Sequence, residues 1–479
     1  MPPYETVARE LAEIVGDTYV STDPDALAWV SRDALDVYRS FGRPPEAGPV
    51  LALVRPKDAA ETAAVLAWAS RWGVAVVPRG GGTGVMGAAI PVRPAVVLDL
   101  GRLDDVVVHA ADMRLEAGAG ATLYSVARAA EEEGLLFAHD PWSVRMATVG
   151  GAISTNGMGY LAGPYGKMGE QVLALEVALA DGTVIATRPT LSGGPGPLVH
   201  RLFAGAEGVF GVITRAWLRA WPLPEVRLFG SFRFSTFAAG FRAVAALFRL
   251  GVVPSMMDMT DSPPLPEEAG DELAAGAPHR AGREVTVLHL GFFGFHEGVQ
   301  AAWSRAMREM ADRGGDFLGP EPAEGYWQHR YDIADRYRTE VHEPRDWRLR
   351  PVHHRGFEYI NVELPASQVL PYRERCLQLI NGFPELLAGE TGLWGRPEIF
   401  SVVIHDVAGG QEGARAMQAA SDRLVQLAQD YGGTMEAIHG PGAKLQPFLR
   451  REWGGAYGVI RAIKGALDPA GVLHAERWA

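Results

Sequence analysis

A glycine-rich segment is the part of this sequence whose residue types point most directly to ligand binding. Pro78-Arg-Gly-Gly-Gly-Thr-Gly84 directly follows an apolar run that predicts a strand. Glycines let backbone N–H groups approach a ligand closely and adopt positive φ, which suits a phosphate cradle. Gly82, Gly84 and Gly87 also have the spacing of a nicotinamide-binding fingerprint, but that fingerprint needs a helix immediately afterwards. Two prolines follow within ten residues instead, so we reject that interpretation; a structural turn is the simpler alternative.

Two further segments of small residues strengthen the binding hypothesis. The segment from Thr148 to Gly159 reads TVGGAISTNGMG and carries Asn156, whose side chain can hydrogen-bond a polar ligand edge. A third segment, GAEGVFGVI, runs from Gly205 to Ile213 beside another predicted strand. Three such segments are hard to explain as turns alone, and together they suit one extended ligand lying across a domain.

The order of these motifs resembles a known family. RGGGTG, TVGGxxxxNxxG, EVxLADG and EGxxGVIT follow one another between about residues 45 and 220, and Ile463–Pro469 resembles a closing IKxALDP motif. The sequence is similar to the FAD-linked oxidases of the vanillyl-alcohol-oxidase or PCMH type, and most similar to their glycolate oxidase/D-lactate dehydrogenase branch.

The resemblance implies that the ligand is FAD. Main-chain amides from Arg79 to Gly84 would hold its pyrophosphate, and the main chain of Ile213 would contact the cofactor. Relatives with covalent flavin often have a histidine in the first glycine segment, whereas this chain has Thr83, so we expect noncovalent FAD. The residues expected to bind the cofactor are Pro78, Arg79, Gly80, Gly81, Gly82, Thr83, Gly84, Asp140, Pro141, Thr148, Gly150, Gly151, Asn156, Gly159, Tyr165, Glu207, Gly208, Val212 and Ile213.

The resemblance also assigns a base. The branch usually has Glu-His-Gly-x-Gly where this chain has Ile438-His-Gly-Pro-Gly442, so His439 matches the position of the presumed base. An isolated histidine is more often structural, but in this motif we favour the catalytic role. The implied reaction is the oxidation of a hydroxy acid or related alcohol, with hydride passing to flavin N5 while His439 takes the hydroxyl proton.

His405 is the second catalytic candidate. The family commonly has a His-x6-His metal motif here, completed by the glutamate before the later histidine. This chain keeps His405, but Glu412 stands at the second position and Ile438 replaces the completing glutamate. Zinc-type catalytic sites want three protein ligands, so we expect no metal. The departure also weakens the simple hydroxy-acid interpretation.

A cluster of arginines, histidines and aromatic residues runs from Tyr326 to Tyr359. Interleaved aspartates and glutamates favour a solvated charged surface. Several arginines in a substrate domain could instead clamp a carboxylate or phosphate, and Arg330 and Arg345 are the residues we select for that role.

Two other functions stay open. Alkylglycerone-phosphate synthase shares the scaffold but performs no net redox reaction, and the lost metal glutamate favours it, although its run of adjacent histidines before Gly440 is absent. A noncatalytic FAD-binding subunit of a larger complex is the other alternative.

Bulk composition limits the remaining classes. The chain has 479 residues, a formal net charge of −12 and one cysteine, Cys376. This charge disfavours nonspecific nucleic-acid binding, and a single cysteine excludes an intrachain disulfide. We find no signal peptide and no apolar stretch long enough to cross a membrane. We therefore expect a cytoplasmic enzyme with a small-molecule substrate and an unidentified electron acceptor; a homo-oligomer stays open.

The elements that must position these groups predict an α+β fold. Short strands and helices alternate from about residue 50 to 221, and Trp221-Pro-Leu-Pro224 marks a boundary. We expect a PCMH-type FAD-binding domain of two subdomains (1–222), a cap domain built on an antiparallel sheet with helices (223–440), and a segment that returns to the FAD domain (441–479). Residues 261–283 are expected to form a loop.

Overall fold

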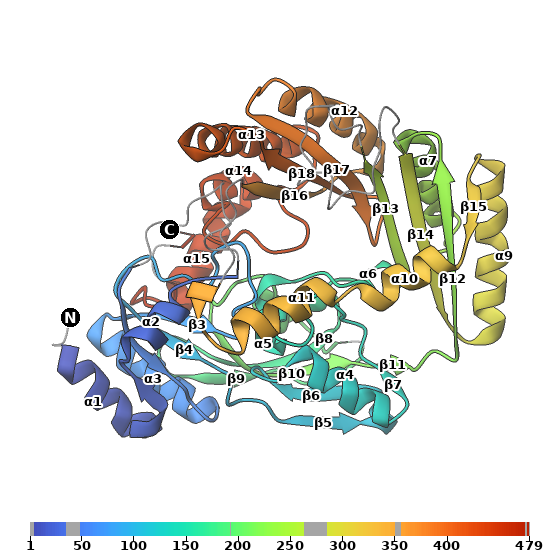
Figure 1. Ribbon diagram of the computed structural model, residues 1–479. Coiled ribbons are helices and arrows are strands. Elements are labelled where there is room, and N and C mark those ends of the chain that lie inside the picture. The colour runs from blue at the N-terminus through green and yellow to red at the C-terminus, as the bar shows by residue number, and fades with distance from the viewer. Residues whose placement is uncertain are drawn as a thin grey trace.

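The computed structural model describes residues 4–34, 48–191, 193–262, 285–349, 356–474 and 477–478. The elements before residue 223 form the lower part of the molecule in Figure 1, and a large sheet with its helices lies above them. This arrangement confirms the predicted α+β class.

Three sheets build the lower part. The first has the order β1-β2-β4-β3, in which β2, β4 and β3 are parallel; its strands are β1 (Val20–Ser21), β2 (Val50–Val54), β4 (Ala95–Asp99) and β3 (Ala75–Arg79). The second is antiparallel and consists of β5 (Val106–His109), β6 (Arg114–Gly118), β10 (Val212–Arg219), β8 (Val172–Ala178) and β9 (Val184–Ala186). The third pairs β7 (Leu135–Leu136) with β11 (Trp221–Pro222).

The helices of this part begin and end where local residue types predict. Helix α3 (Ala59–Trp72) begins after Asp58, whose side chain accepts a hydrogen bond from Glu61 N, and ends at Gly73 with positive φ. Helix α4 (Leu123–Glu132) is capped by Thr122 in the same way. The other helices here are α1 (Tyr4–Val15), α2 (Pro24–Val30), α5 (Val149–Thr155) and α6 (Ala162–Tyr165).

The upper part is one antiparallel sheet of seven strands. Its order is β15 (Asp316–Gly319), β12 (Val226–Phe234), β14 (Val285–Gly294), β13 (Met256–Ser262), β17 (Leu386–Trp394), β18 (Ile399–Asp406) and β16 (Phe357–Glu363). One face packs against α7 (Phe237–Arg249), α9 (His296–Asp312), α12 (Val369–Ile380) and α13 (Gly410–Asp430) around a common apolar core. Helices α10 (Glu321–His329) and α11 (Asp332–Tyr337) cross between this sheet and the lower part (Figure 1).

The chain returns to the lower part after the sheet. Helices α14 (Leu449–Trp453) and α15 (Ala456–Leu467) lead to Leu473, which bridges Val76 of β3. Lys464 Nζ donates to the carbonyl oxygens of Val209 (2.9 Å) and Leu473 (2.7 Å). We keep residues 222 and 440 as proposed domain boundaries. The strands up to residue 222 pair with one another, and the strands after it form the separate seven-stranded sheet.

One sequence expectation needs correction. Asp261 and Ser262 belong to strand β13 rather than to the expected loop, because Asp261 pairs with Thr286 of β14 and Thr391 of β17. The rest of that expected loop, up to residue 283, lies outside the described residues.

Candidate active site

The three glycine segments meet at one place in the lower part. A Cβ on Gly80 would overlap the side chain of Thr148, and one on Gly81 would overlap the carbonyl oxygen of Met146. The third segment joins them, because Glu207 N donates to Ser154 O at 2.8 Å and Gly208 lies against Pro78. Segments far apart in sequence therefore form one continuous surface.

The first glycine segment offers free donors. The main-chain N–H groups of Gly80 to Gly84 make no hydrogen bond with any other described residue, and these residues are not buried. Gly82 has φ of 68°, and nothing lies within 4 Å of a Cβ built on Gly84. The described chain between β3 and β4 contains no helix, which is why a Rossmann-type arrangement is absent there. Unpaired N–H groups beside open space suit an anionic ligand.

The Arg79 side chain makes structural contacts with the end of α2. Its buried guanidinium donates to the carbonyl oxygens of Arg32 (2.9 Å) and Val30 (3.4 Å) at the end of α2. The guanidinium also lies against Gly82, where an added Cβ would be 2.3 Å from Arg79 Nη2, so this side chain supports the glycine segment from the protein side.

The second glycine segment forms the short helix α5. Thr148 caps its start, and Gly150 packs closely against Ala119, where a Cβ would lie 2.8 Å from that residue's own Cβ. Asn156 ends the helix with positive φ, and its Oδ1 accepts a hydrogen bond from Gly169 N at 2.9 Å. The Asn156 side chain therefore stabilises the backbone at the end of this segment by binding Gly169 N.

Other residues expected near the cofactor border the same segment. Gly159 lies against the main chain of Asp140, and Pro141 follows directly. Tyr165 packs edge-on against Trp221 with ring centroids 4.9 Å apart. Val212 and Ile213 begin β10, pair with Ala178 and Val177, and are both buried.

His439 lies on a segment that contacts the second and third glycine segments and the chain just beyond the first. Gly442 N donates to Glu207 at 2.9 Å, and Gly440 would carry a Cβ 3.3 Å from Thr155 O of α5. Lys444 N donates to Met86 O at 3.2 Å, just beyond the first glycine segment. On its other side this segment pairs with the edge of the upper sheet, where Ala437 N donates to Asn361 O at 2.9 Å.

Charged side chains surround the His439 imidazole. Glu436 Oε1 lies 3.6 Å from His439 Nδ1, and the imidazole leaves 30% of its side-chain surface exposed. A buried ion pair joins Lys444 Nζ to Glu358 Oε1 at 2.6 Å. Burial lowers the pKa of His439, the carboxylates of Glu436 and Glu358 raise it, and Lys444 lowers it. The net effect is a lowered pKa, which keeps the ring neutral and able to accept a proton near neutral pH.

Glu207 is the second notable carboxyl group. It is buried, and burial raises its pKa to about 7, although nearby Arg477 and the N–H of Gly442 lower it. The third glycine segment is thus tied to the His439 segment through one titratable side chain.

Arg330 is engaged in a contact between the two parts of the molecule. Its Nε donates to Asp140 Oδ2 at 3.1 Å, its Nη1 to Trp327 O at 2.5 Å and its Nη2 to Tyr331 OH at 2.7 Å. Tyr331 OH also hydrogen-bonds Asp140. Asp140 and Arg330 thus join the glycine-segment side to α10 and α11, and each of the three guanidinium nitrogens already donates one hydrogen bond.

Within the described part of the chain, no hydrogen bond or ion pair joins either of the other two catalytic candidates, Arg345 and His405, to His439. Arg345 is exposed in a turn with φ of 52°. His405 lies on β18 opposite Phe357 and Leu387, and burial lowers its pKa. Glu412 is exposed on the first turn of α13. Among the described residues, no three His, Cys, Asp or Glu side chains gather where they could hold a metal ion.

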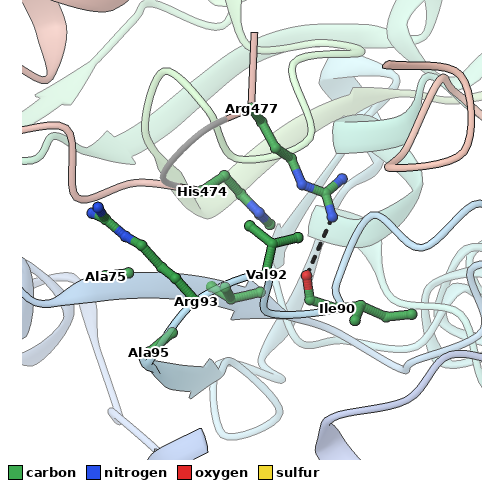
Figure 2. A pocket seen from close by; sticks show the side chains of 8 residues that line it. Ala75, Ile90, Val92, Arg93, Ala95, His474 and Arg477 are labelled. Carbon is green, nitrogen blue, oxygen red and sulfur yellow. Dashed lines mark hydrogen bonds between the residues drawn. The ribbon is translucent and has the colours of Figure 1, made fainter. Parts of the chain in front are cut away.

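A small pocket lies between residues of β3, the chain leading into β4, and His474 and Arg477 near the C-terminal end (Figure 2), where Arg477 donates to Ile90 O at 3.3 Å. Its cavity volume is about 10 Å³, and it is lined by Ala75, Val77, Ile90, Val92, Arg93, Ala95, His474 and Arg477. Ligand pockets usually span roughly 300–1,000 Å³, so this one is too small for a dinucleotide. The glycine surface is the better candidate.

Several residues of the junction were not anticipated from sequence. His139 directly precedes Asp140, is buried, and its Nδ1 has no hydrogen-bond partner among the described residues. Burial lowers its pKa to about 3, so the ring is neutral. It lies 3.8 Å from a Cβ built on Gly157. Glu436, Glu358 and Lys444 were also missed; only Glu436, three residues before His439, carried a local signal.

Comparisons with known proteins agree with this geometry. Residues 50–188 match the family described as "FAD binding domain", and residues 399–476 match "FAD linked oxidases, C-terminal domain". The chain thus matches both the FAD-binding domain and the C-terminal domain of FAD-linked oxidases, in agreement with the motif order.

Particular relatives span almost the whole chain. The D-lactate dehydrogenase of Archaeoglobus fulgidus is 27% identical and covers 92% of this chain and 94% of its own. The glycolate oxidase subunit GlcD of Bacillus subtilis is 24% identical, covering 98% and 95%. Among solved structures, p-cresol methylhydroxylase superposes with a TM-score of 0.77 at 16% identity (99% and 96% covered), and alkyldihydroxyacetonephosphate synthase with 0.75 at 18% (99% and 85%). These structures share the fold.

The residues present fit FAD. The unpaired N–H groups of Gly80 to Gly84 suit a pyrophosphate, and the unpartnered Nδ1 of buried His139 can hydrogen-bond a polar edge of the cofactor.

No helix in the described part of the chain is both long and apolar enough to cross a bilayer.

Proposed function

We propose that the protein oxidises the CH–OH group of a hydroxy acid, or of a related alcohol, with FAD as its electron acceptor. The observation that carries this proposal is the placement of His439 on a segment that is hydrogen-bonded to the third glycine segment through Glu207 and to Met86, just beyond the first. A neutral imidazole next to a flavin surface is the arrangement that alcohol oxidation requires.

The residues have separate tasks in this reaction. The N–H groups of Gly80 to Gly84 bind the cofactor phosphates, and His139 binds a polar edge. His439 accepts the substrate hydroxyl proton at the ring nitrogen that faces away from Glu436. When bound, FAD supplies the two-electron acceptor for the adjacent C–H bond.

Redox chemistry is favoured over the synthase alternative. The relatives that match along nearly the whole of both chains are named as a dehydrogenase and an oxidase subunit. The likeness to alkyldihydroxyacetonephosphate synthase, at 18% identity, supports the fold alone.

Two finer features belong to the proposal. The cofactor is noncovalent, because the first glycine segment has Thr83 where covalent relatives have a histidine; FAD should appear in the supernatant when the protein is precipitated with acid. The location is cytoplasmic, which agrees with a single buried cysteine, Cys376.

Anaerobic flavin bleaching tests the function. The FAD-loaded protein is mixed without oxygen with D-lactate, glycolate and longer D-2-hydroxy acids, and the visible flavin absorbance is followed. We expect at least one of these compounds to bleach the flavin, and the L-enantiomer of that compound to be slower. A flavin that dithionite reduces normally but that none of these compounds reduces would contradict the proposal.

A further inference from the structure

We propose that Glu436 is a positioning residue for His439: its carboxylate fixes the backbone of the segment and stands beside Nδ1, so that Nε2 is left to accept the substrate proton. This inference deepens the proposed function and rests on it for the role of His439.

The first observation is the way Glu436 holds the segment. Its Oε1 accepts hydrogen bonds from three successive main-chain N–H groups, those of Ala437 (3.1 Å), Ile438 (2.7 Å) and His439 (3.0 Å). Successive N–H groups that converge on one point form an anion-binding nest. Here the occupant is the side chain of the residue that begins the turn, so the backbone that carries His439 is fixed by one carboxylate.

The second observation is the position of the same oxygen relative to the imidazole. Oε1 lies 3.6 Å from Nδ1, which is beyond a hydrogen bond but close enough for a direct electrostatic effect. A carboxylate beside Nδ1 favours the tautomer with the proton on Nδ1, because an N–H dipole then points at the negative charge. Nε2 consequently carries the lone pair.

The remaining charges near the ring leave Glu436 with the decisive influence. The other groups that act on His439 are Lys444, on the same segment, and Glu358, on β16 of the upper sheet. These two are buried and joined at 2.6 Å, so their opposite effects on the imidazole largely cancel.

Nuclear magnetic resonance of the FAD-loaded protein tests the tautomer directly. The chain has 13 histidines, and selective ¹⁵N-histidine labelling with a His439→Asn sample identifies the relevant signals. We expect the Nδ1–H tautomer of His439 in the native protein. In Glu436→Gln the tautomer preference should weaken and the His439 pKa should fall, because a charge that raises it has been removed.

The pH dependence of flavin reduction gives a second readout. The reaction needs the neutral imidazole, so its rate rises with pH through the His439 pKa. In Glu436→Gln the midpoint should move to lower pH, by about one unit, and the plateau rate should fall by roughly ten- to a hundredfold. Glu436→Asp keeps the charge and should keep the midpoint near its native value even if the segment is loosened.

Glu452→Gln is the matched control. The Glu452 carboxylate accepts a hydrogen bond from Met435 N at 3.3 Å and so braces the same segment, but it does not act on the His439 pKa. This variant should leave the His439 tautomer and the pH midpoint unchanged.

The outcomes separate the two proposals. An Nε2–H tautomer in the native protein, or a Glu436→Gln variant that loses rate equally at every pH with no change in tautomer, overturns the positioning role. The expected tautomer and pKa shift in a protein that no hydroxy acid reduces would support Glu436 and count against the proposed function.

Discussion

Glu207 and Glu436 hold opposite ends of the turn that carries His439. Glu436 binds the N–H groups up to His439, and Glu207 accepts from Gly442 N at 2.9 Å. Because Glu207 also belongs to the third glycine segment, the base and the cofactor surface are fixed relative to each other by side chains. The consequence at this scale is that a charge change at Glu436 should be felt at the imidazole, whereas Glu207 acts through the position of the turn.

Glu207→Gln tests the raised pKa at this position. A carboxyl group whose pKa rises from 4.5 to about 7 on folding makes the folded state bind more protons between these values, so the native protein loses stability as pH rises through that window. A glutamine keeps an acceptor for Gly442 N but cannot ionise. The melting temperature of Glu207→Gln relative to the native protein should therefore be higher at pH 8 than at pH 5, measured by thermal unfolding. An equal difference at both pH values would show that Glu207 has an ordinary pKa.

Sequence reasoning reached His439 but not the groups that tune it. His439 was selected as the proposed base because its neighbours form a short local motif. Glu358 and Lys444 escaped notice because they are 86 residues apart and meet only when β16 pairs into the upper sheet. Asp140 and Arg330 were both selected, yet for separate roles, because 190 residues separate them.

At the scale of elements, the glycine segments depend on close packing as well as on ligand contact. Gly80 and Gly81 have no room for a side chain, whereas a Cβ on Gly84 meets no protein atom within 4 Å. The two kinds of glycine can therefore be distinguished experimentally, since only the second is open toward the ligand.

Gly84→Ala should weaken FAD binding without destabilising the protein. The added methyl group fits the chain but occupies the space through which the cofactor phosphates reach the N–H groups. FAD titration of the apoprotein should show at least about tenfold lower affinity, equivalent to 1.4 kcal/mol, with an unchanged apoprotein melting temperature. Gly465→Ala, in open space on α15, is the control and should bind FAD normally. A native FAD affinity in Gly84→Ala would show that the cofactor phosphates do not bind at this segment.

Elements with local signals were predicted well, and those without were missed. The ends of helix α3 carry such signals, because Asp58 caps its start and Gly73 follows its last residue with positive φ. Strand β13, with the sequence MMDMTDS, and strand β17, which carries Gly389 and Gly392, were not predicted. Their residues have weak strand preference, and their pairing comes from neighbours distant in sequence.

At the scale of the whole molecule, the upper sheet and the lower part are locked together beside the active site. Arg330 and Tyr331 both hold Asp140. Tyr160, which directly follows the second glycine segment, donates from its hydroxyl to Arg330 O at 3.1 Å and packs edge-on against Trp394 of β17 at 5.3 Å. The distance between substrate face and cofactor surface thus depends on this contact.

Arg330→Met should weaken the contact between the upper sheet and the lower part of the molecule. Removing the guanidinium leaves the buried Asp140 carboxylate without its cation, which costs about 3 kcal/mol, and the melting temperature should fall by several degrees. Arg345→Met removes an exposed arginine of the same cluster and should leave the melting temperature unchanged. The two variants compared by calorimetry decide whether Arg330 is structural; equal melting temperatures would point instead to a free substrate clamp.

The most direct test of the whole account is the rate at which substrate reduces the flavin in His439→Asn. The variant should bind FAD as the native protein does, because His439 Nδ1 and Nε2 hold no part of the glycine surface. Its anaerobic flavin reduction by the best hydroxy acid, followed in a stopped-flow instrument, should be at least about a hundredfold slower. A His439→Asn protein that retains FAD and is reduced as fast as the native protein would contradict the assignment of the base.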